Sequence, residues 1–201
     1  MSRTYSTGLP AFDDRLGGGI PGGSLVALTA PPDSQSELLL YEAAAANDSR
    51  YLSTFRPVDE IREVMPDRVV GEVPVERVRD DQLLEDPGAV FDGFDGNLLV
   101  VDTATELERA GREQYRRALD VLKRRLRATE SAAVLHCLDI EPSPMRRGLT
   151  LGRADVVFRL RLVGLPDRVS PRLLVTKFRR GVAPEEAIDL EFGERPAVAA
   201  E

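Results

Sequence analysis

Two acidic residues follow apolar runs in this sequence, at positions where a carboxylate can bind a metal ion or orient water. Asp102 ends the run NLLVVD, and Glu37 follows the run SLVALT after a short loop. In sheets of parallel strands, ligands bind beyond the carboxyl ends of the strands. Mg²⁺ held between Glu37 and Asp102 is therefore one interpretation. The other, which we favour, is that Asp102 is a relic or caps the helix that follows it.

A cysteine beside a histidine is a second candidate for chemistry, because a thiol paired with an imidazole can act as a nucleophile. His136 and Cys137 both lie in the apolar run 132–138. Adjacent residues of a strand point to opposite faces of the sheet, so these two side chains should not meet. We expect a buried strand here, and a single cysteine excludes an internal disulfide.

Apolar runs that alternate with helical patterns must position these residues. Buried strands are expected at 24–29, 50–54, 97–102 and 132–138, with a further apolar stretch at 69–75. Helices are expected at 34–47, 57–64 and 105–129, and irregular chain at 79–96 and 141–148. Late strands are expected at 154–163, 172–178 and 187–192. This order predicts an α/β fold, in which a mostly parallel sheet with late antiparallel strands is flanked by helices. We expect one domain over residues 1–193 and a flexible tail over 194–201.

The opening segment resembles the entry segment of the KaiC-like and recombinase-type ATPases of the RecA superfamily. Residues 6–24, STGLPAFDDRLGGGIPGGS, are similar to a TG…LD…LGGGIP.GS stretch that leads into the first core strand of those proteins. The strand ending in Asp102 resembles Walker B, residues 154–160 resemble the strand that follows, and residues 176–181 resemble a late basic segment. The resemblance covers nearly the whole chain and is weakest over 68–96. It implies a RecA-like P-loop NTPase fold.

The stretch that aligns with the phosphate-binding loop departs from the family pattern. A working loop reads G-x-x-x-x-G-K-[ST], whose backbone N–H groups, lysine and hydroxyl bind phosphates and Mg²⁺. Here Ala30 and Gln35 replace the glycines, Ser36 replaces the lysine and Glu37 replaces the hydroxyl residue. With Asp102, the vestigial nucleotide site comprises Ala30, Pro31, Pro32, Asp33, Ser34, Gln35, Ser36 and Glu37.

Charge decides what this altered loop can bind. A carboxylate about 5 Å from a phosphate charge costs roughly 3 kcal/mol at an effective dielectric near 20. Asp33 and Glu37 add two carboxylates, and the lysine is missing. We therefore expect no cofactor, although weak binding of ATP with Mg²⁺ through Glu37 and Asp102 stays open as an alternative.

A helix cap offers a structural interpretation of the same loop. Ser34 and Glu37 have the S-x-x-E spacing of a capping box, in which each side chain accepts from the other residue's backbone N–H. Such a cap would satisfy the N–H groups that otherwise bind phosphate. It predicts a loop that stays folded without a nucleotide.

The family's general base is replaced in this sequence, whereas its late basic residues are retained. Phe55 aligns with the acid that activates water in the relatives, and a phenyl ring cannot accept a proton. Asp59 and Glu60, shortly after it, are expected to be ordinary acids at a helix start. Lys177 and Arg179 match the basic segment that reaches a neighbouring subunit's nucleotide in the family. We expect them either to contact a protein neighbour or to lie at a solvated strand end.

An arginine-rich helix raises the question of nucleic-acid binding. Residues 109–127 carry eight basic side chains, but acids are interspersed at spacings that suit pairing along an exposed face. No aromatic stacking platform accompanies them. We expect a solvated helix face and no nucleic acid as a partner.

The composition restricts the remaining classes. The chain has 201 residues, 34 acids and 27 bases of which two are lysines, and no apolar run long enough to span a bilayer. The acidic surface, scarce lysine and abundant alanine suggest a halophile, specifically a haloarchaeon, although high genomic GC content also enriches arginine and alanine. The polar amino-terminus lacks a signal peptide, so we expect a cytoplasmic protein.

Together these features predict a KaiC-like pseudo-ATPase with a degenerate Walker A motif. We expect it not to be an ATP-hydrolysing enzyme, and to act as a regulatory or scaffold protein through protein partners or self-association. The alternatives are a divergent ATP-binding ATPase of the same family and a nucleic-acid-binding accessory protein.

Overall fold

A computed structural model describes residues 3–65, 72–94, 98–164, 169–179, 181–193 and 195–199. Nine strands form one sheet in the order β11-β10-β9-β8-β3-β7-β6-β4-β5. Six strands are parallel: β3 (Leu25–Ala30), β4 (Ser49–Ser53), β5 (Val75–Arg77), β6 (Leu98–Asp102), β7 (Ala132–Leu138) and β8 (Val156–Gly164). Three antiparallel strands extend the β8 edge: β9 (Val169–Phe178), β10 (Ile188–Phe192) and β11 (Pro196–Val198). The predicted α/β class and its late antiparallel strands are confirmed.

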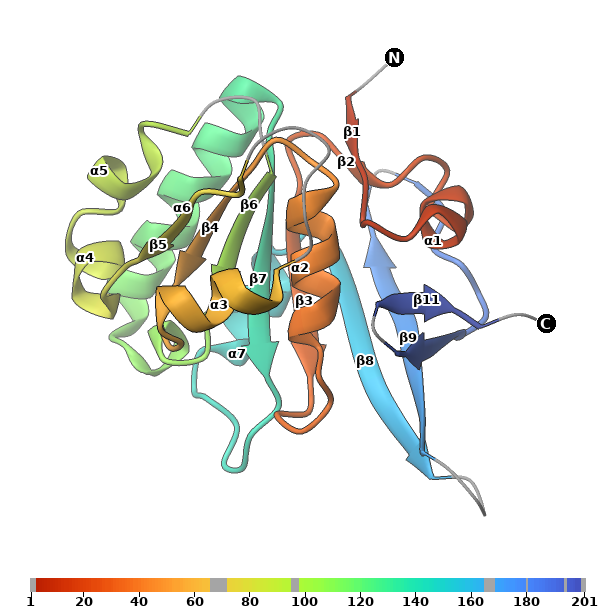
Figure 1. The fold of residues 1–201 in the computed structure, drawn as a ribbon. Coiled ribbons are helices and arrows are strands. Elements are labelled where there is room, and N and C mark those ends of the chain that lie inside the picture. The colour runs from red at the N-terminus through yellow and green to blue at the C-terminus, as the bar shows by residue number, and fades with distance from the viewer. Residues whose placement is uncertain are drawn as a thin grey trace.

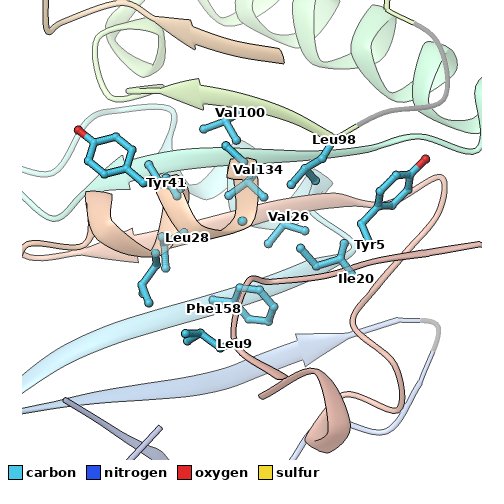
Figure 2. Packing of buried hydrophobic residues seen from close by; sticks show 14 of the residues in the cluster. Tyr5, Leu9, Ile20, Val26, Leu28, Tyr41, Leu98, Val100, Val134 and Phe158 are labelled. Atoms are coloured by element: carbon cyan, nitrogen blue, oxygen red, sulfur yellow. The ribbon is translucent and has the colours of Figure 1, made fainter. Parts of the chain in front are cut away.

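Helices cover both faces of the sheet (Figure 1). On one face, α2 (Glu37–Ala45) packs against Val26 and Leu28 of β3, in the cluster drawn in Figure 2. On the other face, Leu25 of β3 packs with α4 (Asp80–Glu85), α5 (Pro87–Phe91) and α6 (Arg112–Thr129). Because successive residues of a strand point to opposite faces, a continuous apolar run such as β3 is buried on both sides. Within the described residues, no helix is both long and apolar enough to cross a bilayer.

The amino-terminal segment forms a compact turn beside the main sheet. The strands β1 (Thr4–Tyr5) and β2 (Ile20–Pro21) pair around helix α1 (Pro10–Arg15). Asp13 holds this turn, because its carboxylate accepts from the Thr7 amide at 2.8 Å, the Thr7 hydroxyl at 2.7 Å and the Ser6 hydroxyl at 2.5 Å. Gly8 has φ +84°, and a Cβ there would lie 2.5 Å from the Glu42 carbonyl carbon of α2. The amino-terminal segment therefore forms a turn that packs against α2.

Several short elements differ from the expectations. The segment 79–96 contains α4 and α5, and the segment 141–148 leads into α7 (Arg147–Arg153). Pro87 begins α5 and the Asp86 carboxylate caps it, by accepting from the Ala89 amide at 3.1 Å. The helix expected at 105–129 is a 3-10 turn, Leu107–Arg109, followed after Gly111 by α6. Within the tail expected to be flexible, Pro196–Val198 forms β11. The start of the apolar stretch 69–75 lies outside the described residues.

Parallel strands bring their carboxyl ends to one edge, and this edge carries the candidate site. Beyond β3 lies the loop 31–36, and beyond β4 lies Arg56; β6 ends in Asp102. The helix α3 (Val58–Val64) begins just after Arg56. Segments that are far apart in the sequence therefore meet here.

A buried ion pair joins α6 to the start of β8 and supplies a test of this packing. Lys123, expected on the exposed basic face, is 8% exposed and donates to Asp155 at 3.0 Å and to the Arg153 carbonyl at 2.6 Å. Removing one partner leaves a buried charge without its counterion. We expect Lys123→Met to lower the free energy of unfolding by about 3 kcal/mol, measured by urea denaturation.

The control is Arg116→Met on the same helix, where an exposed arginine pairs with Glu113. We expect this change to have little effect. Equal effects of the two changes would contradict the buried-pair assignment.

Candidate functional site

The Asp102 carboxylate contacts three side chains at this edge of the sheet. It is 1% exposed, and its Oδ1 atom lies 2.7 Å from Nδ1 of His136 on β7. Its Oδ2 atom accepts from the Tyr51 hydroxyl at 2.7 Å and from Arg56 Nη2 at 2.7 Å. The expectation that Asp102 caps the next helix is wrong, because its oxygens bind side chains from the two flanking strands and from the turn after β4.

These partners determine the charge states at the site. Burial alone would raise the pKa of Asp102, but the His136 hydrogen bond and the Arg56 charge hold that pKa well below its usual range. Burial and the nearby Asp102 carboxylate raise the pKa of Tyr51 well above that of a free tyrosine. Burial lowers the pKa of Arg56, yet the Asp102 carboxylate more than compensates and raises it. The site therefore holds an anionic carboxylate, a neutral phenol and a cationic guanidinium.

Ser36, at the position of the family's lysine, joins this network through His136. It lies at the end of the loop 31–36, directly before α2, and is 1% exposed. Its Oγ atom is 2.9 Å from Nε2 of His136, which is itself 2% exposed. The three side chains therefore form a continuous chain of hydrogen bonds, from Ser36 through His136 to Asp102.

The predicted capping box of Ser34 and Glu37 is not formed. The helix begins at Glu37 with Ser36 as its flanking residue, so Ser34 lies too early to cap it. The Ser34 hydroxyl instead donates to the Pro31 carbonyl at 2.5 Å. Gln35 adopts a φ of +52°, a left-handed conformation that is uncommon for a residue other than glycine. The loop is thus held by its own turn and not by reciprocal capping.

Arg56 lies between the two carboxylates that were considered as metal ligands. Its Nη1 atom is 3.9 Å from Glu37 Oε1, and its Nη2 atom bonds to Asp102. The guanidinium also lies over the Tyr41 ring, 5.4 Å from the centroid. Burial raises the pKa of Tyr41 to about 12, so this ring stays neutral.

The residues present do not fit a magnesium nucleotide. Pro31 and Pro32 lack the N–H groups through which a phosphate-binding loop works. The Ser36 hydroxyl is bonded to His136, and a cation between Glu37 and Asp102 would meet the Arg56 guanidinium. In the ranges that the structure describes, no group of three or more His, Cys, Asp or Glu side chains is arranged to hold a metal ion.

The residues flanking the site have ordinary surroundings. Phe55, at the position of the family's base, is 67% exposed. Asp59 and Glu60 lie in the first turn of α3, as expected of acids at a helix start. Cys137 is on the face opposite His136, with a pKa raised by burial and by the nearby Glu108 carboxylate. The expectation that Cys137 and His136 do not pair is confirmed.

The late basic residues contact a helix of the same chain. Lys177 Nζ donates to the carbonyls of Leu151 at 2.8 Å and Gly152 at 3.2 Å, near the end of α7. Arg179 donates to the Gly152 carbonyl at 3.2 Å and lies 3.6 Å from Asp155. Both cations therefore satisfy carbonyls at a helix C-terminus. Their role at an interface with another protein stays a prediction.

The arginine-rich helix uses much of its charge within the chain. Arg116 pairs with Glu113 at 2.6 Å and with Asp120 at 3.4 Å, the spacing expected along an exposed face. Arg125 donates to the carbonyls of Phe94 at 2.6 Å and Asp92 at 2.7 Å. One arginine of α6 thus attaches this helix to the chain segment that follows α5.

Sequence reasoning did not select Arg56, Tyr51 or His136 as site residues. Arg56 and His136 belong to the carboxyl ends of strands that flank β6, so the edge rule that selected Asp102 applies to them too. Tyr51 lies two residues before the end of β4 and reaches Asp102 only because of the strand register, in which Ser53 pairs with Asp102. That register is not readable from the sequence.

The lowered pKa of Asp102 makes the stability of the fold depend on pH. A carboxylate whose pKa falls on folding stabilises the folded chain fully above its unfolded pKa of about 4. That contribution is lost as the pH falls through the folded value. We expect Asp102→Asn to lower the free energy of unfolding by about 3 kcal/mol at pH 7. The difference from wild type should shrink progressively below about pH 4.

Denaturant titrations at several pH values measure this difference. Asp59→Asn is the matched control, because the Asp59 side chain is 93% exposed. A difference between Asp102→Asn and wild type that stayed constant into strong acid would contradict the assigned charge state.

Comparison with known proteins adds the family. The chain matches a family of unknown function, DUF7125, over residues 4–201. Among solved structures, a KaiC-like protein from the hyperthermophilic archaeon Pyrococcus horikoshii OT3 is similar, with a TM-score of 0.78, 17% identity and full coverage of both chains. No curated protein matches. At this identity the structural likeness establishes a KaiC-like, RecA-type fold and not an activity. Because the family match spans nearly the whole sequence, the chain belongs to DUF7125.

Proposed function

We propose that this chain is a KaiC-like pseudo-ATPase, which does not hydrolyse ATP and acts as a regulatory or scaffold protein through contacts with other proteins. The observation that carries the proposal is the place of Arg56. Its guanidinium lies between Glu37 and Asp102, at 3.9 and 2.7 Å, where the relatives' fold would put a cation and phosphates. The guanidinium of Arg56 thus supplies the positive charge that a bound cation would otherwise supply.

The size of the charge repulsion beside Asp102 favours a pseudo-ATPase over a divergent ATPase. A cation that entered beside Asp102 would have to displace Arg56 or lie next to it. Two unit charges about 4 Å apart repel by about 4 kcal/mol at an effective dielectric of 20. A divalent ion roughly doubles that cost. The missing lysine and the two prolines of the loop remove the interactions that would offset it.

The position of the relatives' general base is changed as well. Phe55 stands at the position of their catalytic acid, and the next acids in the sequence, Asp59 and Glu60, lie in the first turn of α3. The folded framework is nevertheless complete, with its core, its entry turn and its sheet edge in place. A complete fold without a phosphate-binding loop is suited to binding other proteins. We place this function in the cytoplasm, at the high salt concentration that the acidic composition favours.

The test is a calorimetric titration of the purified protein with ATP and ADP, with and without Mg²⁺, in high-potassium buffer. We expect no binding heat up to about 1 mM nucleotide, which corresponds to a binding free energy weaker than about −4 kcal/mol. An active ATPase of the same fold, measured in the same buffer, is the positive control. Hydrolysis should stay at the background rate.

Micromolar, Mg²⁺-dependent binding that is lost in Glu37→Ala would overturn the proposal. So would ATP turnover above background that is lost in Asp102→Asn. If neither is found, sedimentation of the pure protein and mass spectrometry of proteins retained with it distinguish self-association from a different partner.

A further inference from the structure

Three side chains from separate elements line up at the carboxyl edge of the sheet. Ser36 precedes α2, His136 is on β7 and Asp102 ends β6. Ser36 Oγ lies 2.9 Å from His136 Nε2, and His136 Nδ1 lies 2.7 Å from Asp102 Oδ1. A hydroxyl, an imidazole and a carboxylate in this order, each within hydrogen-bond reach of the next, are the parts of an activated serine nucleophile.

The partners of Asp102 fix the direction of the hydrogen bonds. Its other oxygen accepts from Arg56, whose guanidinium can only donate, and from Tyr51. The carboxylate is therefore an acceptor throughout, so His136 Nδ1 carries a proton and donates it to Asp102. In a neutral ring Nε2 then has a free lone pair and accepts from the Ser36 hydroxyl. This is the tautomer that a general base needs.

The backbone around Ser36 has the form of a strand–turn–helix nucleophile site. The loop leaves β3 at Ala30 and turns through Gln35, whose φ of +52° is a strained conformation of the kind that concentrates at functional sites. Ser36 then stands directly before the nine-residue helix α2. Backbone N–H groups at the start of a helix have no acceptor within the helix and favour negative charge. The Leu38 and Leu39 amides already donate to the carbonyls of Gln35 at 3.1 Å and Ser36 at 3.2 Å. The Ser36 and Glu37 amides are the ones suited to an oxyanion that forms on a carbonyl attacked by Ser36.

We propose that Ser36 is a nucleophile for acyl transfer from small esters, with His136 as its general base and Asp102 as the residue that orients His136. Ser36 Oγ attacks the ester carbonyl carbon and its proton passes to His136 Nε2. The bond from that carbon to the alcohol oxygen then breaks, and His136 returns the proton to the leaving alcohol. Water next attacks the acyl-serine, gives a proton to His136 and releases the acid, while Ser36 recovers its proton. This activity is independent of any nucleotide and goes beyond the scaffold function.

Burial restricts the substrate. Ser36 is 1% exposed, whereas the neighbouring Gln35 and Asp33 are exposed at the surface of the loop. Because the hydroxyl is buried, an ester reaches it only when the surrounding chain moves, so small acyl groups are favoured. Arg56, 25% exposed at the same edge, stays paired with Asp102 and does not bond to the nucleophile.

Covalent labelling with a small alkyl fluorophosphonate tests the proposal directly. A serine activated in this way displaces fluoride and keeps the phosphonyl group, which intact-mass spectrometry detects and peptide mapping locates. We expect a single adduct on Ser36 in the wild-type protein and none in Ser36→Ala. His136→Gln should slow labelling by about 100-fold or more. Ser143→Ala is the matched control, because this serine is exposed and lies outside the loop that carries Ser36, so labelling should be unchanged.

A second measurement does not need the serine to react. In Ser36→Cys, the alkylation rate of the introduced thiol by iodoacetamide at pH 7 should fall by at least tenfold when His136→Gln is added. Peptide mapping separates this thiol from the buried Cys137, and circular dichroism confirms that each variant is folded.

Two results overturn the proposal. The first is a wild-type protein that is folded and is not labelled on Ser36 after prolonged exposure to the reagent. The second is labelling of Ser36, or alkylation of the introduced thiol, at a rate that His136→Gln leaves unchanged. Either result would show that the three side chains serve only to fill the interior. Nucleotide binding affects neither outcome, so the two proposals are tested separately.

Discussion

The carboxylate of Asp102 is buried almost completely, and an ion in that position must be paired or the fold loses several kcal/mol. Three donors pair it, and each belongs to a different piece of chain: Tyr51 to β4, Arg56 to the turn before α3, and His136 to β7. The strand order β7-β6-β4 places these donors on both sides of Asp102. Through His136 the constraint extends to Ser36 and the start of α2. One buried charge thereby fixes the relative positions of four elements.

The same constraint determines how charge is balanced at this edge of the sheet. Here Arg56 supplies a positive charge from the same chain, and Glu37 lies 3.9 Å from its other nitrogen. Because Arg56 belongs to the chain itself, the charge of Asp102 is paired without a bound cation. The entry turn is held separately, by the hydrogen bonds of Asp13 to Ser6 and Thr7.

Much of the framework could be read from the sequence, because its signals are local. Apolar runs such as Leu25–Ala30 are buried on both faces and predict parallel strands, and the edge rule alone selects Asp102. Short helices such as α5 and α7 escaped prediction, because a few residues give no periodicity and their ends depend on contacts such as Arg147 with Glu108, 2.8 Å apart. The contact of Ser36 with His136 joins residues 100 positions apart and depends on how far β7 extends beside β3. A capping box was the best local interpretation of Ser34 and Glu37, yet the helix begins at Glu37 and Ser36, the residue before it, contacts His136.

Stability by itself gives little reason for a buried chain of serine, imidazole and carboxylate. Buried ion pairs and polar networks are often no more stabilising than apolar side chains of the same volume, because desolvation consumes most of the attraction. If this site had no chemical role, aliphatic residues in place of Asp102 and His136 would extend the neighbouring apolar clusters. Instead the polar atoms from Ser36 to Asp102 are each within hydrogen-bond distance of a partner. Packing does not require this arrangement, whereas nucleophilic chemistry does. We therefore infer that Ser36, and not a nucleotide, is the reactive group at this edge of the sheet.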